Sequence, residues 1–127
     1  MSKIRHIAYR AADVETMANF FVDALGMKIT QRRKNRAIDL SDGTINITVL
    51  PLRGAGPNGE PEHQGIDHIG FTVESDEEAA RRLETAGAKK IATIELGSPA
   101  HYETKYKGPE GIVVDIGKWI GTAPVKD

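Results

Sequence analysis

The chain has 127 residues, of which 39% are hydrophobic, and this length suits one domain with a folded core. It carries 17 basic and 18 acidic residues, so its net charge of −1 gives no electrostatic basis for binding nucleic acid or an anionic membrane. Cysteine is absent, which excludes disulfides, thiolate metal sites and cysteine nucleophiles, and no apolar run is long enough to span a bilayer. Because the first residues lead directly into a predicted strand, we expect no signal peptide and a cytoplasmic location.

The first half of the chain predicts one helix among four strands. Asp13 is placed to cap the start of this helix, and Gly26 is placed to end it. Between them, apolar residues recur at helical spacing and form a single stripe. The strands are predicted at 3–10, 27–32, 37–40 and 45–49, and the basic run at 32–36 is interpreted as a solvated hairpin tip.

The second half repeats this order after a linker rich in glycine and proline. Ser75 and Glu78 have the spacing of a capping box, and Gly87 is placed to end the helix that they begin. We expect Trp119 and Ile120 to fold back on the core. The predicted strands are 66–73, 89–95, 100–107 and 112–116.

The two halves therefore predict one unit used twice. His6 and His68 occupy the first strand of each copy, and the helix-ending glycines repeat at nearly the same offset. We predict a single domain over residues 1–127, with one βαβββ module at about 3–52, a linker at 53–65 and a second module at about 66–120.

Strand alternation places His6, His68 and Asp115 on the strand faces that point away from the helices. The bulky apolar residues on the other faces should pack under those helices. Two imidazoles and one carboxylate, with positions left open for water or substrate, suit a reactive divalent metal and above all non-haem Fe(II). A buried aspartate also needs a cation or another partner beside it.

The repeat, His6, the strand at Asp67–Val73 and the closing run at Gly108–Asp115 resemble the vicinal oxygen chelate superfamily. This family includes glyoxalase I, ring-cleaving dioxygenases, methylmalonyl-CoA epimerase, fosfomycin-resistance enzymes and metal-free bleomycin-binding proteins. The resemblance implies an α+β fold in which two modules form a cupped, barrel-like mixed sheet with the helices outside. It also implies a homodimer and the metal ligands His6, His68 and Asp115, with Fe(II) favoured over Mn(II), Ni(II) or Zn(II).

Several departures from the family pattern bear on which reaction the protein could catalyse. Thr48 stands where the four-ligand members, glyoxalase I and the epimerase, carry a further metal ligand, so three protein ligands remain. Asp115 is one methylene shorter than the usual glutamate. Lys105 and Arg53 occupy positions where ring-cleaving dioxygenases usually have a tyrosine and a histidine.

Five further residues are candidates for roles around the metal. His101 and Glu103 are placed to move a proton, and both are candidate catalytic residues. Lys105, Thr48 and Arg10 are candidates for substrate binding. For each of these residues, an ordinary position at the rim of the cavity, without a role in binding or catalysis, is an equally good interpretation.

The sequence thus predicts a metal-dependent enzyme, an oxidoreductase or lyase, with dioxygenase-like or glyoxalase-like activity on a small oxygenated substrate. The alternatives are a metal-free, bleomycin-type binding or resistance protein and a fosfomycin-type transferase or hydrolase.

Overall fold

The computed structural model describes residues 2–95 and 102–117, and it confirms the predicted order of strands and helices. The first copy of the repeat consists of β1 (Lys3–Ala11), α1 (Val14–Leu25), β2 (Lys28–Arg32), β3 (Ile38–Ser41) and β4 (Asn46–Pro51). The second copy consists of β5 (Gly65–Thr72), α2 (Asp76–Thr85), β6 (Lys89–Glu95), β7 (Tyr102–Lys107), a 3-10 turn (Pro109–Gly111) and β8 (Val113–Gly117). None of the helices in these residues is both long and apolar enough to cross a membrane.

The described chain separates into two compact units whose boundaries cut through β1 and β5. The first unit contains residues 6–67, and the second contains residues 2–5 and 68–117 outside the gap at 96–101. Arg5 and His6, which are neighbours in β1, therefore belong to different units. The same is true of Asp67 and His68 in β5.

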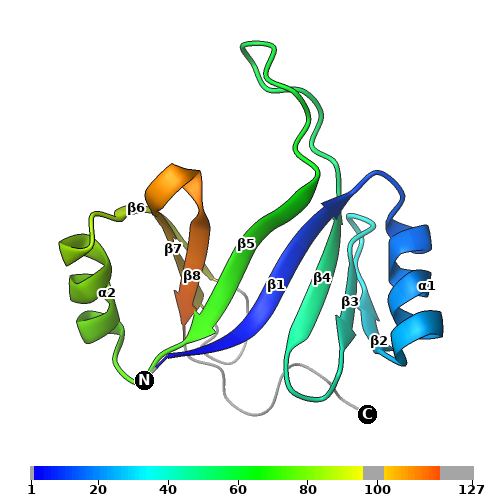
Figure 1. The fold of residues 1–127 in the computed structure, drawn as a ribbon, viewed down its shortest axis with the longest axis horizontal. Coiled ribbons are helices and arrows are strands. Elements are labelled where there is room, and N and C mark those ends of the chain that lie inside the picture. Colours follow the sequence, from blue (N-terminus) through cyan, green and yellow to red (C-terminus); the bar gives the residue numbers. More distant parts are fainter. Residues whose placement is uncertain (1, 96–101, 118–127) are drawn as a thin grey trace. The chain divides into compact units, whose positions relative to one another are not determined.

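Each unit has its strands in the same kind of order (Figure 1). The order is β2-β3-β4-β1 in the first unit and β5-β8-β7-β6 in the second. β1 is parallel to β4, as β5 is to β8, whereas the remaining pairs within each unit are antiparallel. The α+β class and the mixed pairing of two βαβββ modules are thus confirmed.

The predicted helix caps are present. The Asp13 side chain accepts a hydrogen bond from the Thr16 amide, and Gly26 ends α1 in the left-handed conformation with φ of 70°. The Ser75 hydroxyl accepts a hydrogen bond from the Glu78 amide at 3.2 Å. These contacts satisfy backbone groups that a helix end leaves without intrahelical partners.

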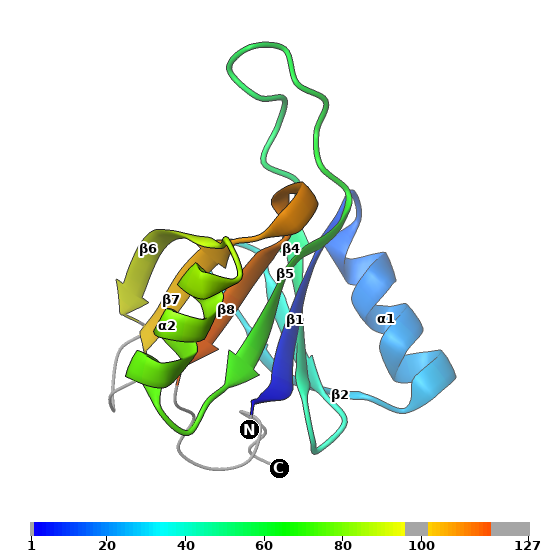
Figure 2. The ribbon, with the colours of Figure 1, turned by 60° about the vertical axis from the view of Figure 1, so that its left-hand side comes forward.

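The helix of the first unit packs on a closed core. Ala18 of α1 is fully buried against Leu40 and Val49, which lie on neighbouring strands. In the second unit, by contrast, α2 has no buried residue, although it lies beside β6 and β8 (Figure 2). The two copies of the repeat therefore share an order of elements but differ in how tightly helix and sheet are packed.

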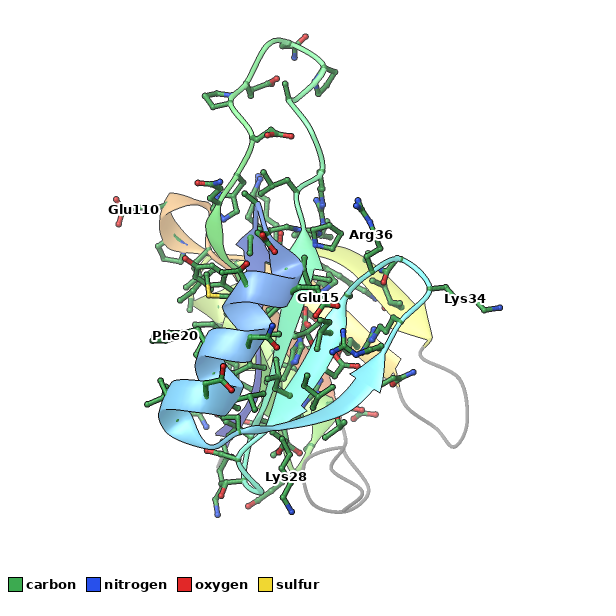
Figure 3. All side chains as sticks on the ribbon, turned by 90° about the vertical axis from the view of Figure 1, so that its right-hand side faces the viewer. Glu15, Phe20, Lys28, Lys34, Arg36 and Glu110 are labelled. Carbon is green, nitrogen blue, oxygen red and sulfur yellow. The ribbon has the colours of Figure 1, made fainter. Side chains whose placement is uncertain are left out.

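The basic run at 32–36 forms the solvated hairpin tip that was predicted, and all of its residues are exposed. Lys34 and Arg36 project outward from the tip between β2 and β3 (Figure 3). Arg33 is also exposed, and its Nε atom donates to Asp39 Oδ2 at 2.7 Å. The buried Asp39 carboxylate requires such a partner, and the local pattern of charges did not reveal it. Trp119 and Ile120 lie outside the described residues.

Candidate metal centre

In the second unit, two of the predicted metal ligands are close together. β5 and β8 are parallel neighbours with Gly70 opposite Asp115, and this register brings the His68 ring to the Asp115 carboxylate. The distance from His68 Nε2 to Asp115 Oδ2 is 3.3 Å. Asp115 is fully buried, and within the described residues its Oδ2 atom has no hydrogen-bond partner. A buried carboxylate oxygen without a donor is costly, so this position suits a cation.

The other oxygen of Asp115 is held by Lys105. These residues are opposite each other on β7 and β8, and Lys105 Nζ donates to Asp115 Oδ1 at 2.8 Å. Burial, followed by repulsion from Glu103, raises the pKa of Asp115 to about 6, although Lys105 and His68 act in the opposite direction. The carboxylate is therefore mainly ionised at neutral pH, with one oxygen committed to Lys105.

A second charged pair extends this group. Arg5 Nη2 donates to Glu103 Oε1 at 3.2 Å, and both side chains are buried. Burial lowers the pKa of the Arg5 guanidinium, and the attraction of Glu103 opposes this shift. Glu103 Oε2 also lies 3.9 Å from Lys105 Nζ. The second unit thus holds a series of alternating charges, formed by Arg5, Glu103, Lys105 and Asp115, that ends beside His68.

In the first unit, His6 is buried and its ring is oriented by a neighbour. His6 and Asn46 are opposite each other on β1 and β4, and His6 Nδ1 donates to Asn46 Oδ1. Because a carboxamide oxygen can only accept, this bond places the proton of a neutral imidazole on Nδ1 and the lone pair on Nε2. Metal-binding histidines are commonly oriented in this way by a hydrogen bond to the other ring nitrogen.

The donor set fits a divalent metal. A metal at about 2.0–2.2 Å from a histidine nitrogen and a carboxylate oxygen holds the two atoms roughly 3 Å apart. The separation of His68 Nε2 and Asp115 Oδ2 is close to this value. That His6, from the other unit, completes the set remains a prediction.

Two of the predicted substrate-binding residues make contacts inside the first unit. Thr48 donates its hydroxyl hydrogen to Asp39 Oδ1 at 2.6 Å. Arg10 donates to Asp67 Oδ1 at 3.1 Å and to the Pro51 carbonyl oxygen at 2.8 Å. Their roles toward a substrate remain predictions.

The other predicted site residues divide between the ion-pair series and the part of the chain that is not described. Glu103 and Lys105 are both engaged in ion pairs of the second unit. Their catalytic and substrate-binding roles also remain predictions. His101 lies outside the described residues.

Sequence reasoning missed Arg5 and Asp39. Both are buried charged residues that hold a predicted site residue by a direct hydrogen bond, Arg5 to Glu103 and Asp39 to Thr48. The available signal was an ionisable residue inside a predicted strand, which is costly to bury without a partner. That signal does not identify the partner, which for Arg5 is 98 residues away.

Solved structures share this fold at low sequence identity. A methylmalonyl-CoA epimerase from Mycobacterium tuberculosis is 17% identical, with 93% of this chain and 88% of that one covered and a TM-score of 0.66. A 2,3-dioxygenase from Pseudomonas sp. KL28 is 16% identical, with 95% of this chain and 42% of that one covered and a TM-score of 0.71. A Mn(II)-bound glyoxalase from Novosphingobium aromaticivorans is 21% identical, with 91% of this chain and 37% of that one covered and a TM-score of 0.70.

The sequence itself identifies the family. None of the curated proteins compared with the chain matches it. Residues 3–116, however, match the sequence profile of the Glyoxalase/Bleomycin resistance protein/Dioxygenase superfamily, and they include both repeats and all the predicted metal ligands. The chain belongs to this superfamily.

Proposed function

We propose that the protein is a metal-dependent enzyme that acts on a small oxygenated substrate, with His6, His68 and Asp115 as the ligands of one divalent metal. The observation that carries this proposal is the buried Asp115 Oδ2 atom, which lies 3.3 Å from His68 Nε2 and lacks a hydrogen-bond partner in the described residues. The orientation of His6 by Asn46 gives independent support from the other copy of the repeat.

Two histidines and one carboxylate favour Fe(II), with Mn(II), Ni(II) or Zn(II) as alternatives. Such a metal would act as a Lewis acid toward vicinal oxygen atoms of the substrate. The activity would be dioxygenase-like or glyoxalase-like, and these two chemistries appear in the names of the Pseudomonas and Novosphingobium proteins.

The ion pairs of the second unit suggest roles for Lys105 and Glu103 in this proposal. Lys105 holds Asp115 Oδ1, so the other carboxylate oxygen is the one that would bind the metal. Glu103 lies 3.9 Å from Lys105 and is placed to hold or accept a proton near the substrate. Lys105 also brings a positive charge that would favour an anionic substrate oxygen.

The first experiment measures metal in protein purified without oxygen. We expect bound metal in the wild type and its loss in His68→Ala and in His6→Ala. His63→Ala is the matched control, because this exposed histidine donates only to the nearby Ile66 carbonyl oxygen among its described contacts. Metal content that is the same in wild type and His68→Ala would refute the proposal. Assays with a catechol and a hemithioacetal then distinguish the two chemistries.

The family resemblance also favours a homodimer, and the metal would then be bound either within one chain or across two. Co-expression of His6→Ala with His68→Ala separates these arrangements. If the ligands come from two chains, each mixed dimer regains one intact site and binds metal. If all three ligands belong to one chain, no mixture restores metal binding.

The Lys105–Asp115 ion pair favours a second candidate function, which is metal-free binding of a small molecule. Lys105 already neutralises the buried carboxylate at 2.8 Å, so the charge of Asp115 alone does not require a metal. Tight binding of a bleomycin-type compound that is unchanged by a chelator would support this candidate over the enzyme.

A further inference from the structure

The sheet face of the first unit that carries His6 also carries polar side chains that hydrogen-bond to one another. Asn46 and Thr48 are two residues apart on β4, so their side chains point to the same face. Asn46 contacts His6, and Thr48 donates its hydroxyl hydrogen to Asp39 Oδ1 on β3 at 2.6 Å. The hydrogen-bonded side chains on this face therefore extend from β1 across β4 to β3.

Asp39 in turn holds Arg33, which lies in the turn between β2 and β3. Arg33 Nε donates to Asp39 Oδ2 at 2.7 Å, and Arg33 Nη2 donates to Asp39 Oδ1 at 3.1 Å. The Asp39 side chain is 4% exposed, whereas the Arg33 side chain is 44% exposed. A carboxylate fixed inside the unit thus holds the guanidinium at the surface by two hydrogen bonds.

These two hydrogen bonds occupy only one side of the guanidinium. A carboxylate can bind an arginine along Nε and Nη2 or across the end formed by Nη1 and Nη2, because N–H groups point in both directions. Asp39 occupies the first position. Among the described residues, no acceptor occupies the second position on Arg33. Arg33 therefore offers a second carboxylate-binding fork, and Asp39 fixes its orientation.

The other basic residues of this turn lie differently. Arg32 pairs with Glu15 of α1 and so lies on the helix side of the sheet. Lys34 and Arg36 project outward from the tip (Figure 3). Arg33 is the member of the basic run that hydrogen bonds fix on the same face as the candidate metal ligand of β1. The positive charges beside it favour the approach of an anion.

We propose that Arg33 binds a carboxylate of the substrate through this second fork, with Asp39 as its positioning residue. This assignment rests on the proposed metal site, because His6 marks where the vicinal oxygens of the substrate bind. β4 lies between β1 and β3, so these strands are two strand spacings, or about 10 Å, apart. The substrate is then an oxygenated carboxylic acid whose carboxylate lies about 10 Å from the metal-bound oxygens.

Two probes that share a pair of vicinal oxygens test the assignment. They are dihydrocaffeate, a catechol with a carboxylate at the end of a short chain, and its methyl ester, which has the same length and no charge. Isothermal titration calorimetry without oxygen measures the Kd of each probe for the Fe(II)-loaded wild type, Arg33→Gln and Lys34→Gln. Lys34→Gln is the matched control, because it removes an exposed positive charge from the same turn.

We expect the wild type and Lys34→Gln to bind dihydrocaffeate about tenfold more tightly than its ester, and Arg33→Gln to bind the two probes equally. A preference that Arg33→Gln retains would overturn the assignment, and so would one that Lys34→Gln also removes. A metal-loaded wild type that binds both probes equally contradicts the assignment alone. A wild type that binds no metal contradicts the proposed function, and the assignment fails with it.

Two further variants separate substrate binding from folding. Arg33→Lys keeps a positive charge beside Asp39 but lacks the planar fork, so it should recover only part of the preference. Asp39→Asn should weaken the preference while metal content and ester binding stay the same, because it removes the charge that holds the guanidinium. Circular dichroism checks that each variant is folded. A full preference in either variant would contradict the role given to the fork or to Asp39.

Discussion

The candidate site of the second unit contains buried charged residues, and a buried charge is costly unless a group of opposite charge lies beside it. Arg5, Glu103 and Asp115 are each less than 10% exposed, and each contacts a residue of opposite charge. Sequence periodicity placed Glu103, Lys105 and Asp115 on one face, because neighbouring side chains alternate along a strand. It could not show which charges meet, since that depends on the register between strands.

Glu103→Gln tests the Arg5–Glu103 pair. The substitution leaves the buried guanidinium without this carboxylate, and losing one member of a buried pair costs about 3–5 kcal/mol in free energy of unfolding. Urea denaturation measures the change. Glu78→Gln is the control, because its pair with Arg81 is exposed and should contribute at most about 1 kcal/mol. Equal effects of the two substitutions would show that burial does not set the strength of the Arg5 pair.

Asp42 gives a prediction about pH. Hydrogen bonds from the amides of Ile45 and Thr44 lower the pKa of Asp42 below its ordinary value of 3.8. A carboxyl whose pKa is lowered by folding stabilises the protein above the unfolded value, and this contribution is lost as the pH falls through the folded value. The stability difference between wild type and Asp42→Ala should therefore shrink from pH 5 toward about pH 2–3. Denaturation at each pH checks this, and a constant difference would contradict it.

At the scale of elements, local signals predicted which helices and strands exist and tertiary pairing decided where they end. Asp13, Gly26 and Ser75 mark the helix ends because each satisfies backbone groups within a few residues. β1 continues to Ala11, beyond its predicted end, because Ala11 is opposite Pro51 of β4. β8 begins only at Val113, because the preceding residue, Ile112, donates its amide hydrogen to the Pro109 carbonyl oxygen in the turn.

Gly26→Ala tests the end of α1. Gly26 has φ of 70°, and an added Cβ would meet no atom within 4 Å, so any cost comes from the backbone conformation rather than from a clash. We expect a loss of about 1–2 kcal/mol in free energy of unfolding, measured by urea denaturation. Gly26→Asn should retain more stability than Gly26→Ala, because asparagine enters the left-handed region more easily. Equal losses in both variants would point to another cause.

At the scale of the whole molecule, duplication explains why the order of elements was predictable and packing was not. Both copies carry the pattern of strand, helix and three strands, so the elements predicted in one copy supported those predicted in the other. The first unit closes its core around Leu40 and Val49, whereas the second leaves a cavity under α2. This difference depends on side-chain volumes brought together from several elements, which no single window of sequence contains.

The boundary between the two units leads to the last prediction. It falls directly before His6 in β1 and directly before His68 in β5. His6 is therefore the first residue of its segment in the first unit, and His68 is the first residue of its segment in the second unit. A metal bound by both histidines would link the units and stabilise only the state in which both are folded. At a free metal concentration about 100 times Kd, this linkage adds about 2.7 kcal/mol to the free energy of unfolding.

Urea denaturation with metal and with a chelator measures that gain. His6→Ala and His68→Ala should each abolish most of it, and the double variant should lose no more than either single variant, because one site is lost only once. His63→Ala should retain the gain. If His6→Ala kept the full stabilisation while His68→Ala lost it, the metal would belong to the second unit alone. The role of His6 would then be its hydrogen bond to Asn46 and not the binding of a shared metal.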